Sequence, residues 1–411
     1  MSRLTSAKLR LELVEELDRV GAFRTSSVRA AFLQVPRELF VQQFAREEGL
    51  EAVYANRLIV TKRDRHGLPL SSSSEPRIMA AMLEALELEE GMRVLEIGTG
   101  TGYNAALLKT LVGRRGRVVS VDLDRELASV ARGALRAGGG YPVRVLCGDG
   151  HDGYARAAPY ERIVATGSSA HVPRAWLDQL RDGGLLELPL RLRSEGALAI
   201  ATFRRVGETL ESQSIVSGRF MPLRGEVAGA GLPPVLTVRS RLGGGGTVVT
   251  RLGGSSLARL SARARDELIA IAGTPPRMHR FGFRTASWPL GLYLSLELPE
   301  SRLVMRYADL AIGVIGRGGR SLALLEGAWE GGDRPTRQRF LAYGEADAEE
   351  DLLSALETWT ARGRPGCEQL RIRIAFAGRR SRISHRWVDS SQRVLVRRSG
   401  TGDNPPRPPD R

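Results

Sequence analysis

Short turns that follow apolar segments carry the residues most able to bind a nucleoside. The first turn begins after Glu96 and alternates glycine with other residues at Gly98, Gly100 and Gly102. Glycine lets the backbone approach a ligand closely and turn sharply into a following helix. Asp122 ends the next apolar segment, where a carboxylate can accept hydrogen bonds from both ribose hydroxyls. Together these residues predict a site for a nucleoside-containing ligand.

A third turn, Gly148-Asp149-Gly150, follows the next apolar segment and places an acceptor where an adenine amino group would lie. A single glycine turn has little meaning, but three such elements in register on consecutive strands are specific. The residues predicted to bind the ligand are Glu96, Gly98, Thr99, Gly100, Gly102, Asp122, Leu123, Asp149 and Gly150.

The spacing of the first turn favours S-adenosyl-L-methionine over NAD as the cofactor. It is G-x-G-x-G rather than the G-x-G-x-x-G that is typical of dinucleotide-binding proteins. The acidic Glu96 would repel a pyrophosphate lying over the loop, whereas it could attract a cationic amino-acid group through water or backbone. S-adenosyl-L-methionine has that cationic group and no phosphates, so it is the expected cofactor.

These turns require a framework of alternating strands and helices, which the sequence shows from Glu75 to about Phe203. Continuous apolar strands joined by helices indicate a parallel sheet covered on both faces, so the predicted fold class is α/β and doubly wound. The expected strands are 93–97, 118–121, 143–147, 162–166 and 185–189, and the expected helices are 76–88, 104–111 and 125–137.

Changes in composition divide the chain into four parts. Apolar positions at helical spacing between residues 7 and 46 predict a helical preface over residues 1–60. The region of alternating strands and helices belongs to a domain over 61–228. Clusters of glycine between shorter strand-like segments then indicate a separate α+β domain over 229–397. The tail, 398–411, has too few apolar residues to fold and is expected to be disordered.

The second domain is expected to contain shorter strands and one clear helix. The helix, 349–359, begins after an acidic stretch that suits a helix N-terminus. The strand candidates are 292–298, 303–307, 322–325, 340–343 and 370–376.

Composition limits the class of protein. The formal net charge of +15 indicates anionic partners, although nearly all of this charge is arginine spread along the chain, and a coding bias explains it equally well. No apolar run approaches the ~20 residues that cross a bilayer, and the first residues lack the apolar core of a signal peptide, so we expect a cytoplasmic protein without a membrane partner. Cys147 and Cys367 lie in strand-like segments, so we expect buried free thiols and no structural metal.

Around these turns the sequence resembles protein-L-isoaspartate O-methyltransferases from residue 28 to about residue 190. The resemblance implies a Rossmann-like class I methyltransferase domain that uses S-adenosyl-L-methionine. It also implies that Ser74 lies beside the acceptor carboxylate and is the catalytic residue. The shared motifs are Val35-Pro36-Arg37-Glu38-Leu39-Phe40, Ser74-Glu75-Pro76, the glycine loop, GDGxxGY at 148–154, Ala158-Pro159-Tyr160, and Val172-Pro173 before Leu177-Asp178-Gln179-Leu180-x-x-Gly183-Gly184.

Two further runs, LPLSSSSEPRIMAAMLEAL at 68–86 and RFMPLRG at 219–225, are similar to an extended, FxLD-type subgroup associated with ribosomally made, modified peptides of the lanthipeptide and graspetide kind. This likeness implies methylation of an aspartate in a precursor peptide, whose ester then closes to a succinimide (aspartimide). Ser73, where the repair enzymes usually have isoleucine, and 167–171, which replaces their alanine loop, favour this branch.

A carboxylate acceptor needs little chemical activation. It is ionised at neutral pH because its reference pKa is near ~4, so it attacks a methyl group without a general base. The enzyme must align the reacting atoms, exclude water and hold the remaining lone pairs of the carboxylate, and Ser74 suits this task as a short hydroxyl donor. The other candidates for the acceptor site are Ser73, Thr166, Ser168 and His171.

The leading hypothesis is carboxyl methylation of an aspartyl or isoaspartyl residue in a protein or precursor peptide, with the second domain recognising an acidic leader. Isoaspartate repair is the alternative with the same chemistry, and a peptide scaffold that binds S-adenosyl-L-methionine without turnover is an alternative of another class. No nucleic-acid partner is expected, because Ile163-Val164-Ala165-Thr166 offers no acceptor motif for base methylation. The sequence does not indicate an oligomeric state.

Overall fold

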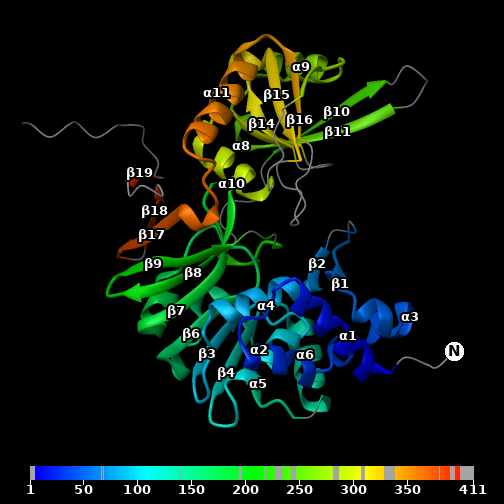
Figure 1. The fold of residues 1–411 in the computed structure, drawn as a ribbon, viewed down its shortest axis with the longest axis vertical. Coiled ribbons are helices and arrows are strands. Elements are labelled where there is room, and N and C mark those ends of the chain that lie inside the picture. The colour runs from blue at the N-terminus through cyan, green and yellow to red at the C-terminus, as the bar shows by residue number, and fades with distance from the viewer. Residues whose placement is uncertain are drawn as a thin grey trace, which may run out of the picture.

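Two large β-sheets organise the chain into two lobes (Figure 1). The first sheet has ten strands in the order β19-β18-β17-β9-β8-β7-β6-β3-β4-β5, and the second has seven in the order β10-β11-β13-β14-β15-β16-β12. The computed structural model describes residues 5–65, 67, 69–138, 140–193, 197–216, 218, 220–226, 234–241, 247–280, 287–306, 311–327, 338–378, 380–388 and 394–398.

Half of the first sheet is the parallel sheet that the sequence predicts. Its strands are β3 (Arg93–Ile97), β4 (Arg117–Asp122), β5 (Val143–Cys147), β6 (Tyr160–Ala165) and β7 (Leu180–Arg191). The chain moves from β3 towards β5 and from β6 towards β7 in opposite directions, so right-handed crossovers place the connecting helices on both faces. The connecting helices are α5 (Tyr103–Leu111), α6 (Arg125–Ala137) and α7 (Arg174–Gln179). The doubly wound α/β fold is therefore confirmed.

The elements that precede β3 pack on one another and on α5. Thr5 and Thr25 cap the first two helices, each accepting a hydrogen bond from a backbone N–H of the first turn. Their apolar faces join the buried cluster that lies against Val94, Val118 and Val164 of the sheet. These elements are α1 (Ser6–Arg19), α2 (Ser26–Gln34), η1 (Arg37–Phe40), α3 (Gln42–Val53), the hairpin of β1 (Ile59–Arg63) and β2 (Pro69–Ser73), and α4 (Pro76–Ala85).

The other half of the first sheet is antiparallel, which the sequence did not indicate. Connections of only a few residues rather than crossover helices join β7 to β8 and β8 to β9, and such short connections make antiparallel neighbours. After the second lobe the chain returns, and β17 pairs with β9. The second lobe is thus inserted between two neighbouring strands, and 370–398 completes the first sheet rather than the second. These strands are β8 (Leu198–Val206), β9 (Thr209–Val216), β17 (Leu370–Ala377), β18 (Arg380–Val388) and β19 (Val394–Arg398).

The second lobe is the expected α+β structure, built on one antiparallel sheet. Helices α8 (Ser255–Ala258) and α9 (Ala262–Ala272) pack on one face, and α10 (Ser287–Glu297) and α11 (Asp347–Ala361) pack on the other. Its strands are β10 (Val235–Arg241), β11 (Thr247–Gly253), β12 (Arg277–Arg280), β13 (Leu303–Arg306), β14 (Ala311–Ile315), β15 (Ser321–Glu326) and β16 (Arg339–Gly344). The remaining short 3-10 helices are η2 (Gly150–Asp152), η3 (Ala155–Ala157), η5 (Arg317–Gly319) and η6 (Cys367–Gln369).

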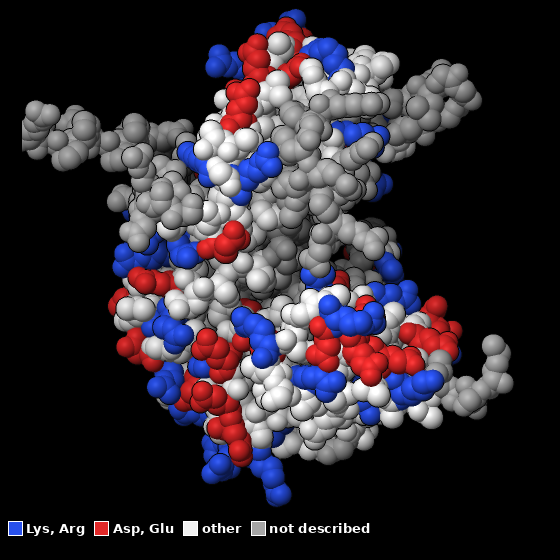
Figure 2. Space-filling view, in the orientation of Figure 1, with Lys and Arg blue, Asp and Glu red and all other residues white. Residues whose placement is uncertain are grey.

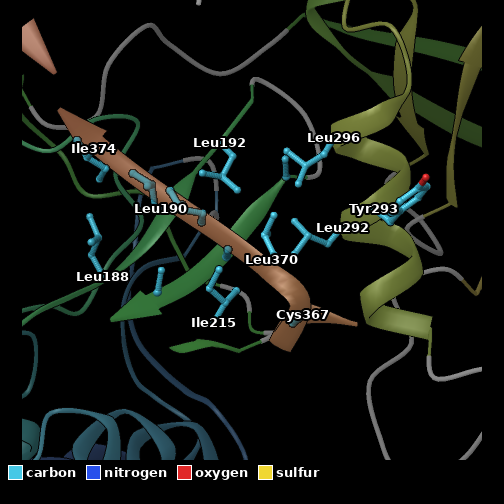
Figure 3. Close-up of a cluster of buried hydrophobic side chains, with 14 of the residues drawn as sticks. Leu188, Leu190, Leu192, Ile215, Leu292, Tyr293, Leu296, Cys367, Leu370 and Ile374 are labelled. Carbon is cyan, nitrogen blue, oxygen red and sulfur yellow. The ribbon is translucent and has the colours of Figure 1, made fainter. Parts of the chain in front are cut away.

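The strand predicted at 292–298 is instead part of helix α10, which lies between the two sheets (Figure 3). Leu292 and Leu296 belong to one buried cluster with Leu190 and Leu370 of the first sheet and with Met305 of the second. Because the helix is covered on several sides, it is apolar all round and lacks the helical periodicity that distinguishes a helix from a buried strand. The same cluster joins the two lobes, since it includes residues of both.

The two cysteines differ in exposure, which corrects the expectation that both are buried. Cys147 ends β5 and is exposed, whereas Cys367 lies in η6 and is buried, and burial raises the pKa of its thiol to about 12. No helix in the described ranges is long and apolar enough to cross a membrane. The tail expected to be disordered, 398–411, lies outside the described residues apart from Arg398.

Candidate active site

A cavity of about 480 Å³ opens at the carboxyl ends of β3, β4 and β6. This edge of a doubly wound sheet is where such folds bind ligands. Nine of the predicted site residues line the cavity: Ser73, Ser74, Gly98, Thr99, Gly100, Asp122, Leu123, Gly150 and Thr166. The other five do not line it: Glu96, Gly102, Asp149, Ser168 and His171.

The glycine loop approaches the turn after β6 so closely that Gly98 admits no side chain. Its φ is +94°, and a Cβ atom built on it would lie 2.5 Å from Oγ1 of Thr166. That hydroxyl donates hydrogen bonds to the carbonyl oxygens of Gly98, at 2.5 Å, and Ile97, at 3.2 Å. Gly102 has a different role, because it precedes α5 with a φ of +88° and packs against Ala131 of α6. The loop thus forms a cradle at Gly98 and a helix junction at Gly102.

Asp122 is held at the end of β4 by two backbone groups. Its Oδ2 accepts a hydrogen bond from the N–H of Gly100 at 2.9 Å, and its Oδ1 accepts one from the N–H of Asp124 at 2.9 Å. These bonds orient the carboxylate towards the cavity that it lines. A carboxylate oxygen has lone pairs left for further donors, so the placement suits ribose hydroxyls.

Glu96 lies beneath the loop, fully buried, and supports it from inside. Its two carboxylate oxygens accept hydrogen bonds from Nδ2 of Asn104, at 2.8 Å, and Oγ of Ser120, at 2.5 Å. The Ser120 hydroxyl is also 2.6 Å from Oγ1 of Thr99. Burial raises the pKa of the Glu96 carboxyl to about 7, although both hydrogen bonds oppose the shift. Asn104 lines the cavity, so Glu96 acts on it indirectly.

Asp149 is occupied by the chain segment that leaves the first lobe. Its carboxylate accepts hydrogen bonds from the N–H of His151, at 2.9 Å, and the N–H of Glu226, at 3.0 Å. A Cβ atom on Gly225 would lie 2.3 Å from its Oδ2, so this contact requires glycine. Of the predicted third turn, only Gly150 reaches the cavity wall.

The four serines form another part of the cavity wall: Ser71 and Ser72 lie beside the glycine loop, 3.7 and 3.6 Å from a Cβ built on Gly100, and Ser73 and Ser74 follow at what we call the acceptor end. Ser71, Ser72, Ser73 and Ser74 all line it, at the end of β2 and just before α4. The Ser73 hydroxyl accepts hydrogen bonds from Arg37, and the residue Ser73 is only 3% exposed. Ser74 is half-buried, and its hydroxyl makes no hydrogen bond to any other residue that the structure describes. Ser74 is therefore the serine able to donate to a ligand.

The loop after β6 carries the two acceptor-site candidates that do not line the cavity, Ser168 and His171. The chain leaves the first lobe through residues 220–226, which we call the exit segment. The backbone of Ser168 pairs with this segment, donating to the carbonyl of Met221 at 2.8 Å and accepting from the N–H of Leu223 at 2.9 Å. The His171 ring is half-buried, with its centroid 6.1 Å from that of His151. Burial and the neighbouring His151 lower the pKa of His171. Neither residue lines the cavity.

Several lining residues were not predicted from the sequence. Thr101, Tyr103 and Asn104 extend the glycine loop, Met79 and Leu83 come from α4, and 220–224 come from the exit segment. The sequence did give a signal for the exit segment, because the run RFMPLRG at 219–225 resembles the extended subgroup. Its place against the cofactor end depends on the strand pairing of β8 and β9, which no local pattern reveals.

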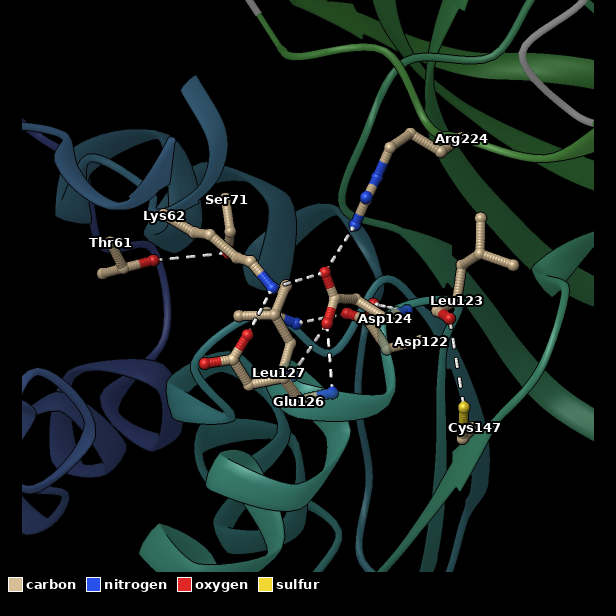
Figure 4. Close-up of polar contacts among 11 residues, drawn as sticks. Thr61, Lys62, Ser71, Asp122, Leu123, Asp124, Glu126, Leu127, Cys147 and Arg224 are labelled. Atoms are coloured by element: carbon tan, nitrogen blue, oxygen red, sulfur yellow. Dashed lines mark hydrogen bonds and ion pairs between the residues drawn. The ribbon is translucent and has the colours of Figure 1, made fainter. Parts of the chain in front are cut away.

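An ion-pair network beside the cavity links β1, the start of α6 and the exit segment (Figure 4). Asp124 lies between Lys62 of β1, whose Nζ is 2.8 Å from its Oδ2, and Arg224 of the exit segment, whose Nη2 is 3.4 Å from the same oxygen. Partial burial opposes ionisation, but hydrogen bonds from Lys62, Leu127 and Arg224 lower the pKa of Asp124 to about 2. Lys62 also pairs with Glu126 at 2.7 Å.

The cavity fits a nucleoside that carries no phosphate. Among its described lining residues, Arg224 is the only basic one, and it is paired with Asp124. Leu123 and Leu127 supply apolar surface beside the Asp122 carboxylate. On the face shown in Figure 2, acidic and basic residues are interspersed over the first lobe. The donor set therefore suits S-adenosyl-L-methionine better than a dinucleotide.

Comparison with known proteins identifies relatives of this lobe. The family described as protein-L-isoaspartate(D-aspartate) O-methyltransferase matches residues 8–228. An enzyme of Ignicoccus hospitalis named protein-L-isoaspartate O-methyltransferase is 40% identical over 182 residues, which cover 44% of this chain and 80% of that protein. One of Pyrobaculum neutrophilum with the same name is 37% identical over 213 residues, covering 52% and 97%.

The similarity of fold extends beyond the first lobe. A solved structure named protein-L-isoaspartate O-methyltransferase is 26% identical, with a TM-score of 0.52, and the match covers 91% of this chain and 99% of that one. The family's enzymes depend on S-adenosyl-L-methionine, the cofactor that the glycine loop and Asp122 predict. The chain is thus an S-adenosyl-L-methionine-dependent methyltransferase that belongs to the protein-L-isoaspartate(D-aspartate) O-methyltransferase family.

Proposed function

We propose that this enzyme methylates the free carboxylate of an isoaspartyl residue in a protein or peptide. The observation that carries the proposal is that one cavity is lined both by Gly98, Thr99 and Asp122 and by Ser74. A cofactor and an acceptor can therefore meet in a single cavity. The names of the relatives favour isoaspartate as the acceptor.

The cofactor end would be held by hydrogen bonds and by shape. Asp122 would accept from the ribose hydroxyls, Leu123 would cover the base, and the backbone of Gly98 and Gly100 would lie against the remainder. When bound, S-adenosyl-L-methionine supplies an electrophilic methyl group on a sulfonium. The chain itself has to keep that end dry and fixed, which Met79, Leu83 and Leu223 support as apolar wall residues.

The acceptor end needs a donor rather than a base. An isoaspartyl carboxylate is ionised at neutral pH and attacks through one oxygen, so its other lone pairs require a partner. Ser74 is half-buried, lines the cavity and has a hydroxyl available. His171, the titratable candidate for this end, does not line the cavity, which agrees with a reaction that needs no general base.

Methylation of an aspartate in a ribosomally made precursor peptide is the competing hypothesis. Its support is the serine at position 73 and the loop at 167–171, together with the basic charge of the chain. The relatives, however, carry names that refer to isoaspartate, so we favour isoaspartate over the precursor-peptide aspartate that the extended subgroup would imply. The assignment of the second lobe to leader recognition and the cytoplasmic location stay predictions.

Mass spectrometry of three peptides tests the proposal. A peptide with one isoaspartyl residue, its aspartyl isomer and an acidic precursor peptide encoded beside the gene are incubated with enzyme and S-adenosyl-L-methionine. We expect a gain of one methyl on the isoaspartyl peptide alone. Methylation of the precursor alone, followed by loss of methanol, would replace the proposal with peptide maturation. Cofactor binding without methylation of any peptide would indicate a scaffold.

Two serine variants test the role given to Ser74. Ser74→Ala should lower kcat/KM for the acceptor by about 10- to 100-fold, because a hydrogen bond to a charged group is worth roughly 1.5–3 kcal/mol. Ser72→Ala is the matched control, since Ser72 is also half-buried and lines the cavity. It should change kcat/KM by less than about twofold, as expected for a hydroxyl outside the reaction. Equal effects would remove Ser74 from the mechanism.

A further inference from the structure

Arg37 is fully buried and binds both segments that frame the acceptor end of the cavity. Its five N–H groups make seven hydrogen-bond contacts, some of them shared between two acceptors. One set of contacts goes to the carbonyl oxygens of Val53, Ala55 and Arg57, between α3 and β1, at 3.0, 3.3 and 3.1 Å. The other goes to the Ser73 hydroxyl and to the carbonyls of Ser73 and Ser74, the last at 2.9 Å. One planar guanidinium thus fixes two loops relative to each other.

No carboxylate among the described residues forms an ion pair or a hydrogen bond with Arg37, although the charge of Glu75 also acts on it. Within the described part of the chain, every hydrogen bond that it makes ends on a neutral oxygen. Its residue is 0% exposed, and burial lowers the pKa of the guanidinium to about 10. Burying a charge without a counter-ion is unfavourable unless hydrogen bonds compensate for it, and the compensating bonds of Arg37 all go to the two segments that it joins. Neutral residues could close an ordinary loop without this cost.

Arg162 provides an internal comparison. It is also a buried arginine, 8% exposed, whose hydrogen bonds go to backbone carbonyls, those of Leu86, Glu87 and Glu161. It lies in β6 near the amino end of the strand, whereas the cofactor and serine loops lie at the carboxyl end. The two arginines share burial and bonding but differ in what they hold.

We propose that Arg37 is a positioning residue for the acceptor, an inference that rests on the proposed function. It fixes Ser73 and Ser74 at the cavity wall, and its positive charge, which no described carboxylate contacts directly, makes that end of the cavity favourable for a carboxylate. The first effect depends on the fork of the guanidinium, which spans both loops; a lysine ammonium has three donors at one point and cannot span them. The second depends only on the positive charge.

Three variants of the full-length enzyme separate these effects from a general loss of stability. Arg37→Lys keeps the charge and loses the fork, Arg37→Met loses both, and Arg162→Lys is the matched control. Each is compared with wild type for its melting temperature, the Kd of S-adenosyl-L-methionine, and kcat and KM for the isoaspartyl peptide. The Ki of the same peptide with its acceptor carboxylate replaced by an amide then reports the preference for charge.

Arg37→Lys should lower kcat/KM for the acceptor by about 100-fold, the size expected when a reacting group is displaced by about 1 Å. Its cofactor Kd should stay within about threefold of wild type, and its preference for the acid over the amide should persist. Arg37→Met should also lose about tenfold of that preference, because the nearby charge is gone. Arg162→Lys should leave kcat/KM within about threefold, even at an equal fall in melting temperature.

Equal losses of kcat/KM in Arg37→Lys and Arg162→Lys would overturn the positioning role, and an unchanged acid preference in Arg37→Met would overturn the electrostatic role. Should Arg37→Met not fold, Ser73→Ala removes one partner of Arg37 and should lower kcat/KM by about fivefold without altering the cofactor Kd. An inactive wild type would instead overturn the proposed function, together with the acceptor site on which this inference depends.

Discussion

The two ends of the cavity are built in different ways. At the cofactor end, Asp122 is fixed by the N–H groups of Gly100 and Asp124, and Glu96 by Asn104 and Ser120, all from consecutive strand-and-turn units. At the acceptor end, Ser73 and Ser74 are held by Arg37, which lies 36 residues before Ser73. Residues 220–224 of the exit segment add a wall from still further along the chain.

This difference separates two kinds of constraint. The cofactor end follows from the local geometry of glycine turns at the edge of a parallel sheet, so a substitution there should weaken cofactor binding whatever the acceptor. The acceptor end depends on contacts between distant segments, so a substitution there should change the use of the acceptor and spare the cofactor. Three experiments test this division, beyond those on Ser74 and Arg37.

The largest expected effect is that of Gly98→Ala, which acts where the two ends touch. The new Cβ would lie 2.5 Å from Oγ1 of Thr166, at a φ of +94° that L-residues rarely adopt. Backbone strain and crowding together should lower the free energy of unfolding by about 4 kcal/mol. Cofactor affinity should also fall, and calorimetry with chemical denaturation measures both quantities.

A matched glycine shows which cause dominates. Gly91 has a φ of +91° with no atom within 4 Å of a built Cβ, so Gly91→Ala carries the strain without the crowding. It should lower the free energy of unfolding by only about 1–2 kcal/mol and leave cofactor affinity unchanged. Adding Thr166→Ala to Gly98→Ala should restore part of the loss. No restoration would mean that the two ends are not coupled through this contact.

An intermediate effect is expected for the pH dependence that Glu96 contributes. Its folded pKa of about 7 exceeds the ordinary carboxyl value of 4.5, so the contribution is fully present below about pH 4.5 and is lost as the pH rises through 7. The free energy of unfolding should fall by up to about 3 kcal/mol over this range. Glu96→Gln should flatten the profile measured by urea denaturation at pH 5, 6, 7 and 8.

The flattening should be incomplete, because Glu187 acts in the same direction. Burial raises the pKa of Glu187 well above its usual value, and it receives one hydrogen bond, from Thr202 at 3.3 Å. The double variant Glu96→Gln, Glu187→Gln should therefore show less pH dependence than either single variant. A profile that Glu96→Gln leaves unchanged would mean that this carboxyl ionises normally, and the cofactor end would then lose its buried neutral support.

The smallest expected effect is at the ion-pair network beside the cavity, where the Asp124 carboxylate contacts both Lys62 and Arg224. Lys62→Ala or Arg224→Ala should raise the Kd of S-adenosyl-L-methionine by about two- to fivefold, since partly exposed ion pairs contribute roughly 0–1 kcal/mol. The increase should shrink at high salt, where such pairs are screened. Lys8→Ala, which breaks the exposed pair with Glu12, is the control and should leave Kd unchanged. A salt-independent increase would point to packing rather than charge.

The cofactor end was predicted largely from the sequence, and the acceptor end only in part. Gly98, Thr99, Gly100, Asp122 and Gly150 all line the cavity as expected. Asp149 does not, because Gly225 and Glu226 occupy its carboxylate, and these residues follow two antiparallel strands that the sequence did not reveal. Arg37 was visible as part of a motif, but its contacts with Ser73 and Ser74 arise only when the helical preface packs on the hairpin.

The sequence by itself determined what depends on neighbours along the chain: the parallel half of the sheet, its connecting helices, the glycine loop and the carboxylate at the end of β4. Each of these follows from periodicity or from a turn that a few adjacent residues specify. Tertiary structure alone decided the rest. Helix α10 is apolar all round because two sheets cover it, and the second lobe is an insertion because β17 returns to pair with β9. Such features depend on which segments, far apart in the sequence, pack against one another, and short patterns of residues do not predict this packing.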